Sequence, residues 1–515
     1  MSGASGPRRG SAPSLERYRS IVPDWAAFAG AAARPEPTVF RVRTGRASPE
    51  EVARRLTDQG FRLRPLEGMP GFHQVEEEPY PVTFTLEHWA GLIYVQQAST
   101  GVAAPALGPG PGERVLDLCA APGGKTTHAA DLMGDTGSLV AADVSEGRIR
   151  GLLGNVYRLG HTNVAVVAGD GRELPEAARF DRVLVDAPCS GEGTLRRRGG
   201  ELPRQSTSFL GWVTGAQEAL LRKAIRVTRP GGVVLYVTCT FAPEENEAVV
   251  DAVLRDEDVA LEPLALPVPH ARGLTSFEGR RFHPDLEGAA RIYPHHLDSG
   301  GLFLARLRVG GRSRDAGEGA ASSAGADPSA RAAAAGDAAW TPVPTVFPGE
   351  EATEEESAEA VARAEEALTD YYGLDPSVFR GMGWTLRGGR LWLHSLDGWP
   401  LEAWEPGAWR PISVGFRAME FDRRDRPRPT NDVLQWLGPR IRRSVVELDD
   451  DEVDRVLARQ LLPHREGLKG LVAFRWRGTV LGRGACTAEG IRSEIPKARA
   501  RELARGREKE REARR

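Results

Sequence analysis

The chain has 515 residues, more than one hydrophobic core usually supports, so we expect several domains. Its 68 Lys and Arg residues are balanced by 71 Asp and Glu residues, and the net charge of −3 excludes nucleic-acid binding through a global positive excess. The four cysteines lie far apart without a C-x-x-C pair, and no run of about 18 apolar residues occurs, which argues against a disulfide framework, a metal site and a membrane span. We therefore expect a cytoplasmic protein.

The first 109 residues are predicted to form a tail and a small domain. Residues 1–35 are rich in Gly, Pro, Ser, Arg and then Ala, which is typical of a flexible tail that leads into a short helix. An α+β accessory domain is expected over residues 36–109. In it, 38–43 alternates like a strand, Ser48 begins a capping-box pattern for a helix, and 61–66 is typical of a second strand.

Residues 110–310 alternate between apolar runs and helical stretches, which predicts a parallel sheet of the doubly wound α/β class. The expected strands are RVLDLC, SLVAAD, VAVVAGD, FDRVLVDAP and GGVVLYVTC, with helices at 125–133, 145–160, 214–228 and 243–255. The strands deliver polar or sulfur side chains at their carboxyl ends, namely Asp117, Asp143, Asp170, Asp186 and Cys239. One Asp after a strand is ordinarily a helix cap, but four acids and a thiol at one edge predict an active site.

The sequence VLDLCAAPGGKT at 115–126 organises this domain. A buried strand, a glycine turn and a helix start let a nucleotide-like cofactor lie against backbone N–H groups. A P-loop would need glycine where Cys119 stands, and Gly123-Gly124 does not supply the G-x-G-x-x-G of a dinucleotide site. The remaining interpretation is S-adenosylmethionine (SAM), whose ribose hydroxyls are held by an acid after the second strand. Asp143 is placed for that role.

The C-terminal part is predicted to contain a linker and two small domains. Residues 311–345, rich in Ala, Gly and Ser, are typical of a disordered linker. A first C-terminal domain is expected over 346–432, with an acidic helix and several tryptophans, and a second over 433–496. Residues 497–515 form a basic tail able to touch phosphate. Tryptophan and arginine surfaces can stack bases, although tryptophans more often fill small cores.

Two expected strands end near a cysteine. Cys189 follows Asp186 in the sequence DAPCSG, and Cys239 lies in the sequence TCT. Neighbouring parallel strands lie about 4.8 Å apart, so both thiols can face one cofactor cleft. Methylation of pyrimidine C5 would use such a pair, because a thiolate that adds to C6 makes C5 nucleophilic and the thiol must later be expelled. Asp186 would steady the charge that develops near N3.

The sequences DLCAAPGGKT, VDAPCSG, TCT and PEENE together resemble the RNA cytosine-C5 methyltransferases of the Nop/Sun type. The order of segments is similar to bacterial members that act on 16S RNA of the small ribosomal subunit. The resemblance implies a Rossmann-like SAM-dependent methyltransferase core, a small α+β N-terminal domain and small C-terminal β-rich, PUA-like RNA-binding domains. It also implies a protein that forms 5-methylcytosine in ribosomal RNA, and we expect a monomer.

The same resemblance assigns roles to residues. It makes Cys239 the nucleophile, gives Cys189 to product release and places Asp186 with them. The cofactor contacts that it implies are Cys119, Ala120, Ala121, Pro122, Gly123, Gly124, Lys125, Asp143, Asp170 and Asp186. Arg148 and the three arginines at 196–198 are added as cofactor, phosphate or substrate contacts by position only.

Three alternatives remain open at this point. The substrate could be transfer RNA instead of ribosomal RNA. The chain could also be a catalytically idle SAM-binding scaffold in ribosome assembly, although a scaffold needs neither thiol. A DNA methyltransferase is the third alternative, but that chemistry uses a Pro-Cys nucleophile and usually no second thiol.

Overall fold

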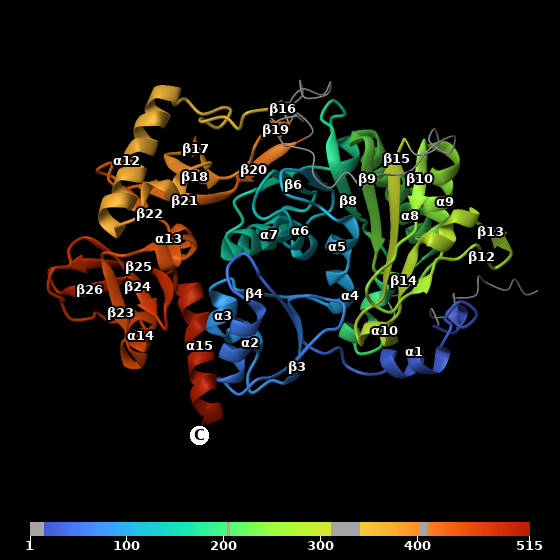
Figure 1. The fold of residues 1–515 in the computed structure, drawn as a ribbon, viewed down its shortest axis with the longest axis horizontal. Coiled ribbons are helices and arrows are strands. Elements are labelled where there is room, and N and C mark those ends of the chain that lie inside the picture. The colour runs from blue at the N-terminus through green and yellow to red at the C-terminus, as the bar shows by residue number, and fades with distance from the viewer. Residues whose placement is uncertain (1–14, 203–205, 311–339, 401–408, 515) are drawn as a thin grey trace, which may run out of the picture.

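The structure, a computed structural model, describes residues 15–202, 206–310, 340–400 and 409–514 (Figure 1). Within these ranges a ten-stranded mixed sheet forms the central domain, preceded in the chain by one four-stranded sheet and followed by two more. Among the described helices, none combines the length and apolar character that a bilayer crossing requires. Most of the predicted linker, 311–339, lies outside the described residues, and Trp340–Thr341 after it forms strand β16.

The region 1–35 is predicted as a flexible tail that leads into a short helix; residues 1–14 lie outside the described residues, and residues 15–35 pack against the central domain. This packed segment contains the 3-10 helix η1 (Leu15–Tyr18) and helix α1 (Trp25–Ala32). The buried ring of Phe28 lies edge-on to Phe241 and Tyr293, with ring centroids 5.4 and 5.9 Å apart. Aromatic burial of this kind outweighs the local tendency of an Ala- and Gly-rich sequence to stay disordered.

The N-terminal domain is an antiparallel sheet with short helices. Its strands β1 (Val39–Val42), β2 (Arg62–Pro65), β3 (Phe72–Glu77) and β4 (Ile93–Val95) are arranged in the order β2-β3-β1-β4. Helix α2 (Pro49–Thr57) begins as predicted, because the Ser48 hydroxyl accepts a hydrogen bond from the Glu51 N–H at 3.1 Å. Three short helices follow: α3 (Leu86–Trp89), α4 (Ala98–Gly101) and α5 (Ala103–Leu107).

The central sheet confirms the predicted doubly wound class. Its parallel strands are β5 (Arg114–Asp117), β6 (Ser138–Asp143), β7 (Val164–Ala168), β8 (Phe180–Asp186) and β9 (Thr228–Thr238). The full order is β11-β14-β15-β9-β8-β5-β6-β7-β20, in which β14 (Ala290–Ile292), β15 (Leu302–Val309) and the two-residue β11 (Ala271–Arg272) extend one edge antiparallel to β9 or to one another. Strand β10 (Val259–Glu262) pairs with β15.

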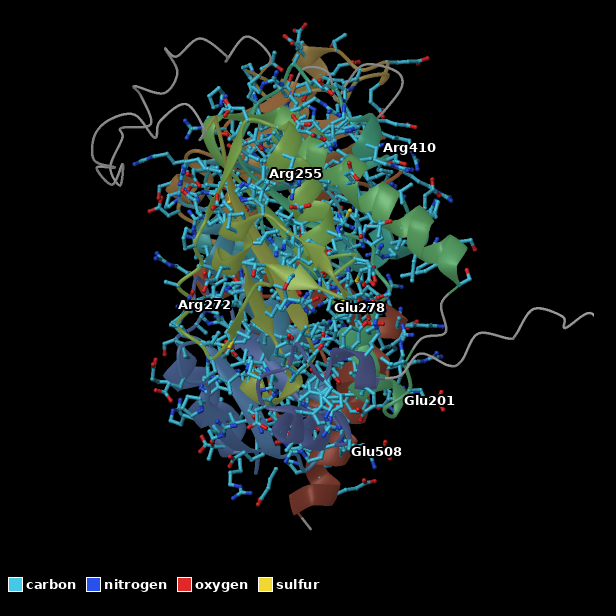
Figure 2. All side chains as sticks on the ribbon, turned by 90° about the vertical axis from the view of Figure 1, so that its right-hand side faces the viewer. Glu201, Arg255, Arg272, Glu278, Arg410 and Glu508 are labelled. Atoms are coloured by element: carbon cyan, nitrogen blue, oxygen red, sulfur yellow. The ribbon has the colours of Figure 1, made fainter. Side chains whose placement is uncertain are left out.

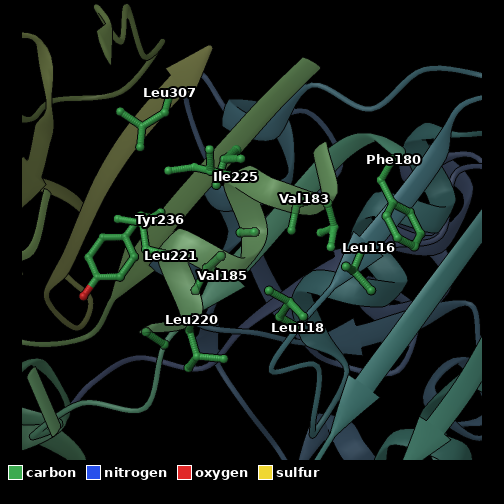
Figure 3. Packing of buried hydrophobic residues seen from close by; sticks show 14 of the residues in the cluster. Leu116, Leu118, Phe180, Val183, Val185, Leu220, Leu221, Ile225, Tyr236 and Leu307 are labelled. Atoms are coloured by element: carbon green, nitrogen blue, oxygen red, sulfur yellow. The ribbon is translucent and has the colours of Figure 1, made fainter. Parts of the chain in front are cut away.

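Helices cover both faces of this sheet, and the alternation of side chains along each strand explains why. They are α6 (Gly124–Leu132), α7 (Glu146–Leu159), α8 (Thr207–Val227) and α9 (Glu247–Asp256), close to the predicted ranges. On one face Leu116 and Val183 belong to the same buried cluster as Leu221 of α8 (Figure 3). Val115, next to Leu116, belongs to the cluster on the other face. Burial on both faces is why these strands are nearly continuous apolar runs.

The segment predicted as a first C-terminal domain is joined to the central sheet. Its helix α12 (Glu354–Tyr372) accompanies a sheet of β17 (Gly383–Arg387), β18 (Arg390–His394), β21 (Phe416–Phe421) and β22 (Pro427–Pro429). Strand β20 (Arg410–Val414), however, pairs antiparallel with β7 and becomes an edge of the central sheet. Trp384, Trp399 and Trp409 are buried, so they fill cores and do not present faces to bases.

The last unit is a sheet with a long C-terminal helix. It contains α13 (Asn431–Leu437), β23 (Val445–Leu448), α14 (Asp450–Leu457), β24 (Leu471–Trp476), β25 (Thr479–Thr487), β26 (Gly490–Ser493) and α15 (Lys497–Arg514). The predicted basic tail is therefore a packed helix, which runs alongside the N-terminal domain (Figure 1). The Trp89 indole N–H donates to the Arg499 carbonyl at 3.3 Å, and Arg507 pairs with Asp454 at 3.2 Å. The Arg507–Asp454 ion pair leaves less of the helix charge available for phosphate than the sequence suggests.

Charged side chains of both signs are spread over the surface. On the face in Figure 2, the labelled residues Arg255, Arg272, Glu201 and Glu278 lie apart from one another. This distribution agrees with the near-zero net charge.

Candidate active site

The strand order places a crevice at the carboxyl end of β5. The chain runs from β5 outward to β6 and β7, and then returns to the other side of β5 with β8 and β9. Doubly wound sheets bind ligands where the strand order reverses in this way. Asp117, Asp143 and Asp186 end β5, β6 and β8, and Cys239 directly follows β9. The predicted row of polar side chains is thus on one edge of the sheet.

The turn after β5 is shaped around two glycines. Gly123 caps α6 with a φ of +103°, and a Cβ there would lie 2.7 Å from Leu152 Cδ1. A Cβ on Gly124 would lie 3.3 Å from the ring of Tyr94, which the N-terminal domain contributes. Gly123 must be glycine because an L side chain rarely adopts such a φ, whereas a Cβ at Gly124 would require Tyr94 to shift by only a few tenths of an ångström. The two glycines therefore let Leu152 and Tyr94 pack closely on the turn at the start of α6.

Asp143 is a buried carboxylate that organises the turn. Its side chain is 1% exposed, and its two oxygens accept the Ala121 N–H at 3.1 Å and the Ser145 N–H at 2.9 Å. The exposed guanidinium of Arg148 lies 3.4 Å from Asp143 and donates to the Ala121 carbonyl. A carboxylate has about four acceptor sites, so Asp143 keeps acceptor capacity beyond the two backbone bonds.

Val144 is an apolar side chain that the sequence did not single out. It directly follows Asp143 and is 69% exposed, which makes it one of the few exposed large hydrophobic residues among those described. A flat apolar ring that lay on it would remove this surface from water. Its position beside the Asp143 carboxylate suits a ligand with a hydroxylated sugar next to an aromatic base.

Asp170 and Asp117 have different surroundings from each other. Asp170 forms a bidentate ion pair with Arg172, whose hydrogen bonds lower the pKa of the carboxyl. Asp117 is fully enclosed, and burial raises its pKa to about 7 against the opposing hydrogen bond from the Thr126 hydroxyl at 2.7 Å. Asp170 therefore lies at the surface of the crevice with its carboxylate hydrogen-bonded to Arg172, whereas Asp117 is buried inside the turn.

The two predicted cysteines meet. Cys189 Sγ and Cys239 Sγ are 3.2 Å apart, and the Cys239 N–H points to Cys189 Sγ at 3.4 Å. Both are free thiols, as are Cys119 and Cys486. The hydrogen bond from the Cys189 thiol, with help from the Lys125 ammonium, lowers the pKa of Cys239. The same contact and burial raise the pKa of Cys189. Cys239 is thus the better thiolate, with Cys189 as its proton donor.

An ion pair lies next to the thiols. Lys125 Nζ is 2.6 Å from Asp186 Oδ2. Burial opposes the charge of Lys125, but the Asp186 carboxylate outweighs burial and raises the pKa of the amine. The site therefore contains two adjoining thiols of unequal acidity, a hydrogen-bond donor and an acceptor within one crevice. Within the described ranges, no three His, Cys, Asp or Glu side chains gather as a metal site would require.

Comparisons with known proteins agree with this geometry. The family model described as 16S rRNA methyltransferase RsmB/F matches residues 104–308. A ribosomal RNA small subunit methyltransferase F from Vibrio vulnificus is 30% identical over 504 residues, which cover 95% of this chain and 97% of that protein. The chain belongs to the RsmB/F methyltransferase family. Membership in the RsmB/F family confirms the predicted enzyme class and its cofactor, SAM.

Other relatives match the central region. A mouse 28S rRNA (cytosine-C(5))-methyltransferase is 36% identical over 280 residues, which are 53% of this chain but 35% of the mouse protein. The crystal structure of a methyltransferase homologue from Pyrococcus horikoshii superposes with a TM-score of 0.52 at 35% identity, covering 57% of this chain and 93% of that one. These matches confirm the Rossmann-like core of the RsmB/F fold.

One position-based prediction is wrong. Arg196, expected as a phosphate or substrate contact, has a side chain that is only 1% exposed. It donates to the carbonyls of Arg34 and Pro35 and pairs with Asp298. It therefore fastens the N-terminal segment of this RsmB/F chain and does not face solvent. The neighbouring Arg197 is exposed and pairs with Glu36 at 3.0 Å.

Sequence reasoning also missed residues that build the site. Tyr94 packs on the glycine turn from another domain, and Val144 carries no pattern that distinguishes it from a helix-cap neighbour. Glu245, in the sequence PEENE, bonds to the loops of both cysteines. The signal that could have found Glu245 is its place in that acidic motif, six residues after the Cys239 strand end.

Proposed function

We propose that this protein is a SAM-dependent methyltransferase that forms 5-methylcytosine in RNA, with 16S ribosomal RNA as its substrate. The observation that carries the proposal is the contact of 3.2 Å between the Cys189 and Cys239 sulfurs beside the Lys125–Asp186 pair. Two adjoining thiols of unequal acidity serve a reaction in which one attacks a carbon and the other assists its departure.

The residues of the turn fit the cofactor. The backbone N–H groups at the start of α6, placed by the Gly123 turn, would face SAM. Asp143 would accept hydrogen bonds from the ribose hydroxyls of SAM, and Val144 would lie against its adenine. Asp170 and Arg148 would lie at the edge of the same SAM-binding site. When bound, SAM supplies an electrophilic methyl group.

Cys239 would act first. Its thiolate attacks C6 of the cytosine, so that an S–C6 bond forms and the electrons of the C5=C6 bond make C5 nucleophilic. The Lys125 ammonium and the Asp186 carboxylate would hydrogen-bond the polar edge of the ring and stabilise charge that develops there during the attack. Their positions are set before reaction by their mutual ion pair.

Cys189 would act after methyl transfer. A solvent water then accepts the C5 proton, the C5–H bonding electrons restore C5=C6, and the S–C6 bond breaks to return Cys239 as a thiolate. Cys189 lies within hydrogen-bonding distance of the departing sulfur and lowers its basicity. A thiolate of lower pKa is the better leaving group.

The C-terminal units would bind RNA. We infer a PUA-like RNA-binding role for residues 433–496, supported by the exposed arginines Arg440, Arg442 and Arg443 after α13. In contrast, Arg475 and Arg483 of the same unit pair with Glu447 and Glu494. The RNA surface would therefore be the arginine loop at 440–443. The cytoplasmic location and the monomeric state stay predictions.

Bisulfite sequencing of total RNA from a deletion strain tests the function. The proposal predicts that at least one cytosine of 16S RNA loses its protection, and that wild-type protein restores it while Cys239→Ala does not. A change confined to transfer RNA would support the alternative substrate. Unchanged protection in all RNA would contradict the enzyme and favour the idle scaffold.

A further inference from the structure

A fully buried glutamate connects the loops that carry the two cysteines. Glu245 is 0% exposed, and its Oε2 accepts the Ser190 N–H at 2.9 Å and the Gln217 Nε2–H at 3.0 Å. The same Gln217 nitrogen donates to the Pro188 carbonyl at 2.8 Å. The backbone on both sides of Cys189 is therefore held by one carboxylate and one amide.

The Cys239 loop is bound to the same carboxylate. The Thr240 hydroxyl lies 3.3 Å from Glu245 Oε1 and 3.2 Å from Glu192 Oε2, and it accepts from the Ser190 hydroxyl at 2.7 Å. Residues next to each cysteine thus touch each other as well as Glu245. Because a hydroxyl has one proton, Thr240 can donate to only one of the two carboxylates at a time.

Glu192 carries the network to the N-terminal segment. The buried Tyr18 hydroxyl donates to Glu192 Oε2 at 2.6 Å. Burial raises the pKa of Glu192, the Tyr18 hydrogen bond opposes this rise, and the charge of Glu245 adds to it. Glu192 therefore holds a proton more readily than an exposed glutamate does.

The Gln217 side chain holds the Cys189 loop although this leaves one of its own polar atoms without a hydrogen bond in the described part of the chain. Its amide must turn the NH₂ group toward both Pro188 and Glu245, and its Oε1 atom then has no hydrogen-bond partner among the described residues. An unsatisfied buried oxygen is unfavourable and is rare unless it serves another purpose. Here the purpose is to fix the Pro188–Ser190 backbone around Cys189.

We propose that Glu245 is a positioning residue that locks the two cysteine loops together and so keeps the Cys189 thiol in hydrogen-bonding contact with Cys239 Sγ. The catalytic importance of this contact rests on the proposed function. The positioning of the two cysteine loops by Glu245 does not depend on that function. Glu245 does not touch the reacting atoms. It acts through Ser190 and Thr240, each adjacent to one of the cysteines.

The groups that face Cys239 make the sign of the effect testable. They are the Cys189 thiol and the Lys125 ammonium, which favour the thiolate, and the carboxylates of Asp186 and Glu245, which disfavour it. If Glu245 acted through its charge alone, its removal would make Cys239 more acidic. If Glu245 holds Cys189 in place, its truncation makes Cys239 less acidic, because the thiol hydrogen bond is lost.

The experiment measures the rate of alkylation of Cys239 by iodoacetamide against pH, with mass spectrometry of the Cys239 peptide, in the full chain without RNA. We expect Glu245→Ala to slow alkylation at pH 7.5 about tenfold, which corresponds to a rise of one pKa unit. Glu245→Gln keeps an acceptor oxygen for Ser190 and Gln217, so its rate should equal or exceed that of the wild type.

Glu247 offers a matched control. It is equally buried two residues further along, but it pairs with Arg291 and not with the cysteine loops. Glu247→Gln should lower the melting temperature and leave the Cys239 pH profile unchanged. If Glu245→Ala does not fold, Gln217→Met removes the amide at similar size and should also slow alkylation.

Two results would overturn the proposal: an unchanged Cys239 profile in folded Glu245→Ala or Gln217→Met, or faster alkylation in either variant. Methyl transfer is measured separately with Cys239→Ala. If Cys239→Ala still methylates RNA, the role proposed for Cys239 fails, and if the wild-type protein does not methylate RNA, the proposed function fails. The alkylation result would then stand on its own as a test of how the two loops are joined.

Discussion

Replacing Gly123 by alanine tests whether the turn is shaped for the cofactor. At a φ of +103° a residue other than glycine costs about 1–3 kcal/mol. The added methyl also lies 2.7 Å from Leu152 Cδ1, and Leu152 is enclosed in the core, so overpacking adds about 1–3 kcal/mol. We expect the free energy of unfolding to fall by roughly 2–6 kcal/mol in total. Any relief of this strain moves the turn, so SAM should bind at least tenfold more weakly in calorimetry.

A control and a double-mutant cycle separate the two effects. Gly134 has a φ of +63° and no neighbour within 4 Å of an added Cβ, so Gly134→Ala should lose only about 1–2 kcal/mol and bind SAM normally. Because Leu152 is buried, shortening it to alanine destabilises by itself, but it should cost about 1–3 kcal/mol less in the Gly123→Ala background than in the wild type. Additive stabilities together with normal SAM affinity would refute the argument.

Three further predictions concern Asp117, Asp143 and the arginine loop at 440–443. Because the pKa of Asp117 is raised to about 7 in the folded protein, this residue contributes stability that is lost as the pH rises from about 4 to 7. Asp117→Asn should remove roughly 4 kcal/mol of this pH dependence of the unfolding free energy, measured by urea denaturation. An unchanged dependence on pH would contradict the argument that burial raises the pKa. Asp143→Ala should weaken SAM binding by about 1–3 kcal/mol in calorimetry. Unchanged affinity would show that Asp143 does not contact SAM. Replacing the three loop arginines by glutamine should lower the slope of log K against log salt for RNA by about 2–3, whereas the ion-paired Arg475→Gln should have little effect.

The central sheet could be predicted from the sequence because local and tertiary preferences agree there. Strands such as β6 and β9 are apolar on both faces and end at polar residues, so their boundaries are visible in the pattern. Helix α2 could also be placed, because its cap uses the Ser48 side chain next to it in the chain. The strand boundaries and the helix cap each depend on residues that are close together in the sequence.

Features that depend on distant partners could not be predicted. The packing of Phe28 against Tyr293 joins residues far apart in the chain, and nothing in the N-terminal composition indicates it. Strand β20 looks like part of a separate unit until its pairing with β7 is seen. The charge of α15 similarly appears free for phosphate, although Arg507 is paired with Asp454.

The candidate site was partly visible for the same reason. Parallel strand spacing predicts that Cys189 and Cys239 share a crevice, and their sulfurs do meet. The support around them comes from Glu245 and Gln217, which lie on other segments and bond to backbone atoms. Hydrogen bonds to backbone leave no signature in side-chain patterns, so sequence reasoning found the thiols but not what holds them.

The most direct test of the account compares Cys239→Ala with Cys189→Ala in the presence of RNA and SAM on a denaturing gel. If Cys239 attacks C6 and Cys189 serves release, Cys189→Ala should accumulate a slow-migrating covalent protein–RNA band, and Cys239→Ala should show neither band nor methyl transfer. A band from Cys239→Ala that is absent from Cys189→Ala would exchange the roles of the two cysteines. No band from either variant, with only a mild loss of stability, would contradict the covalent mechanism.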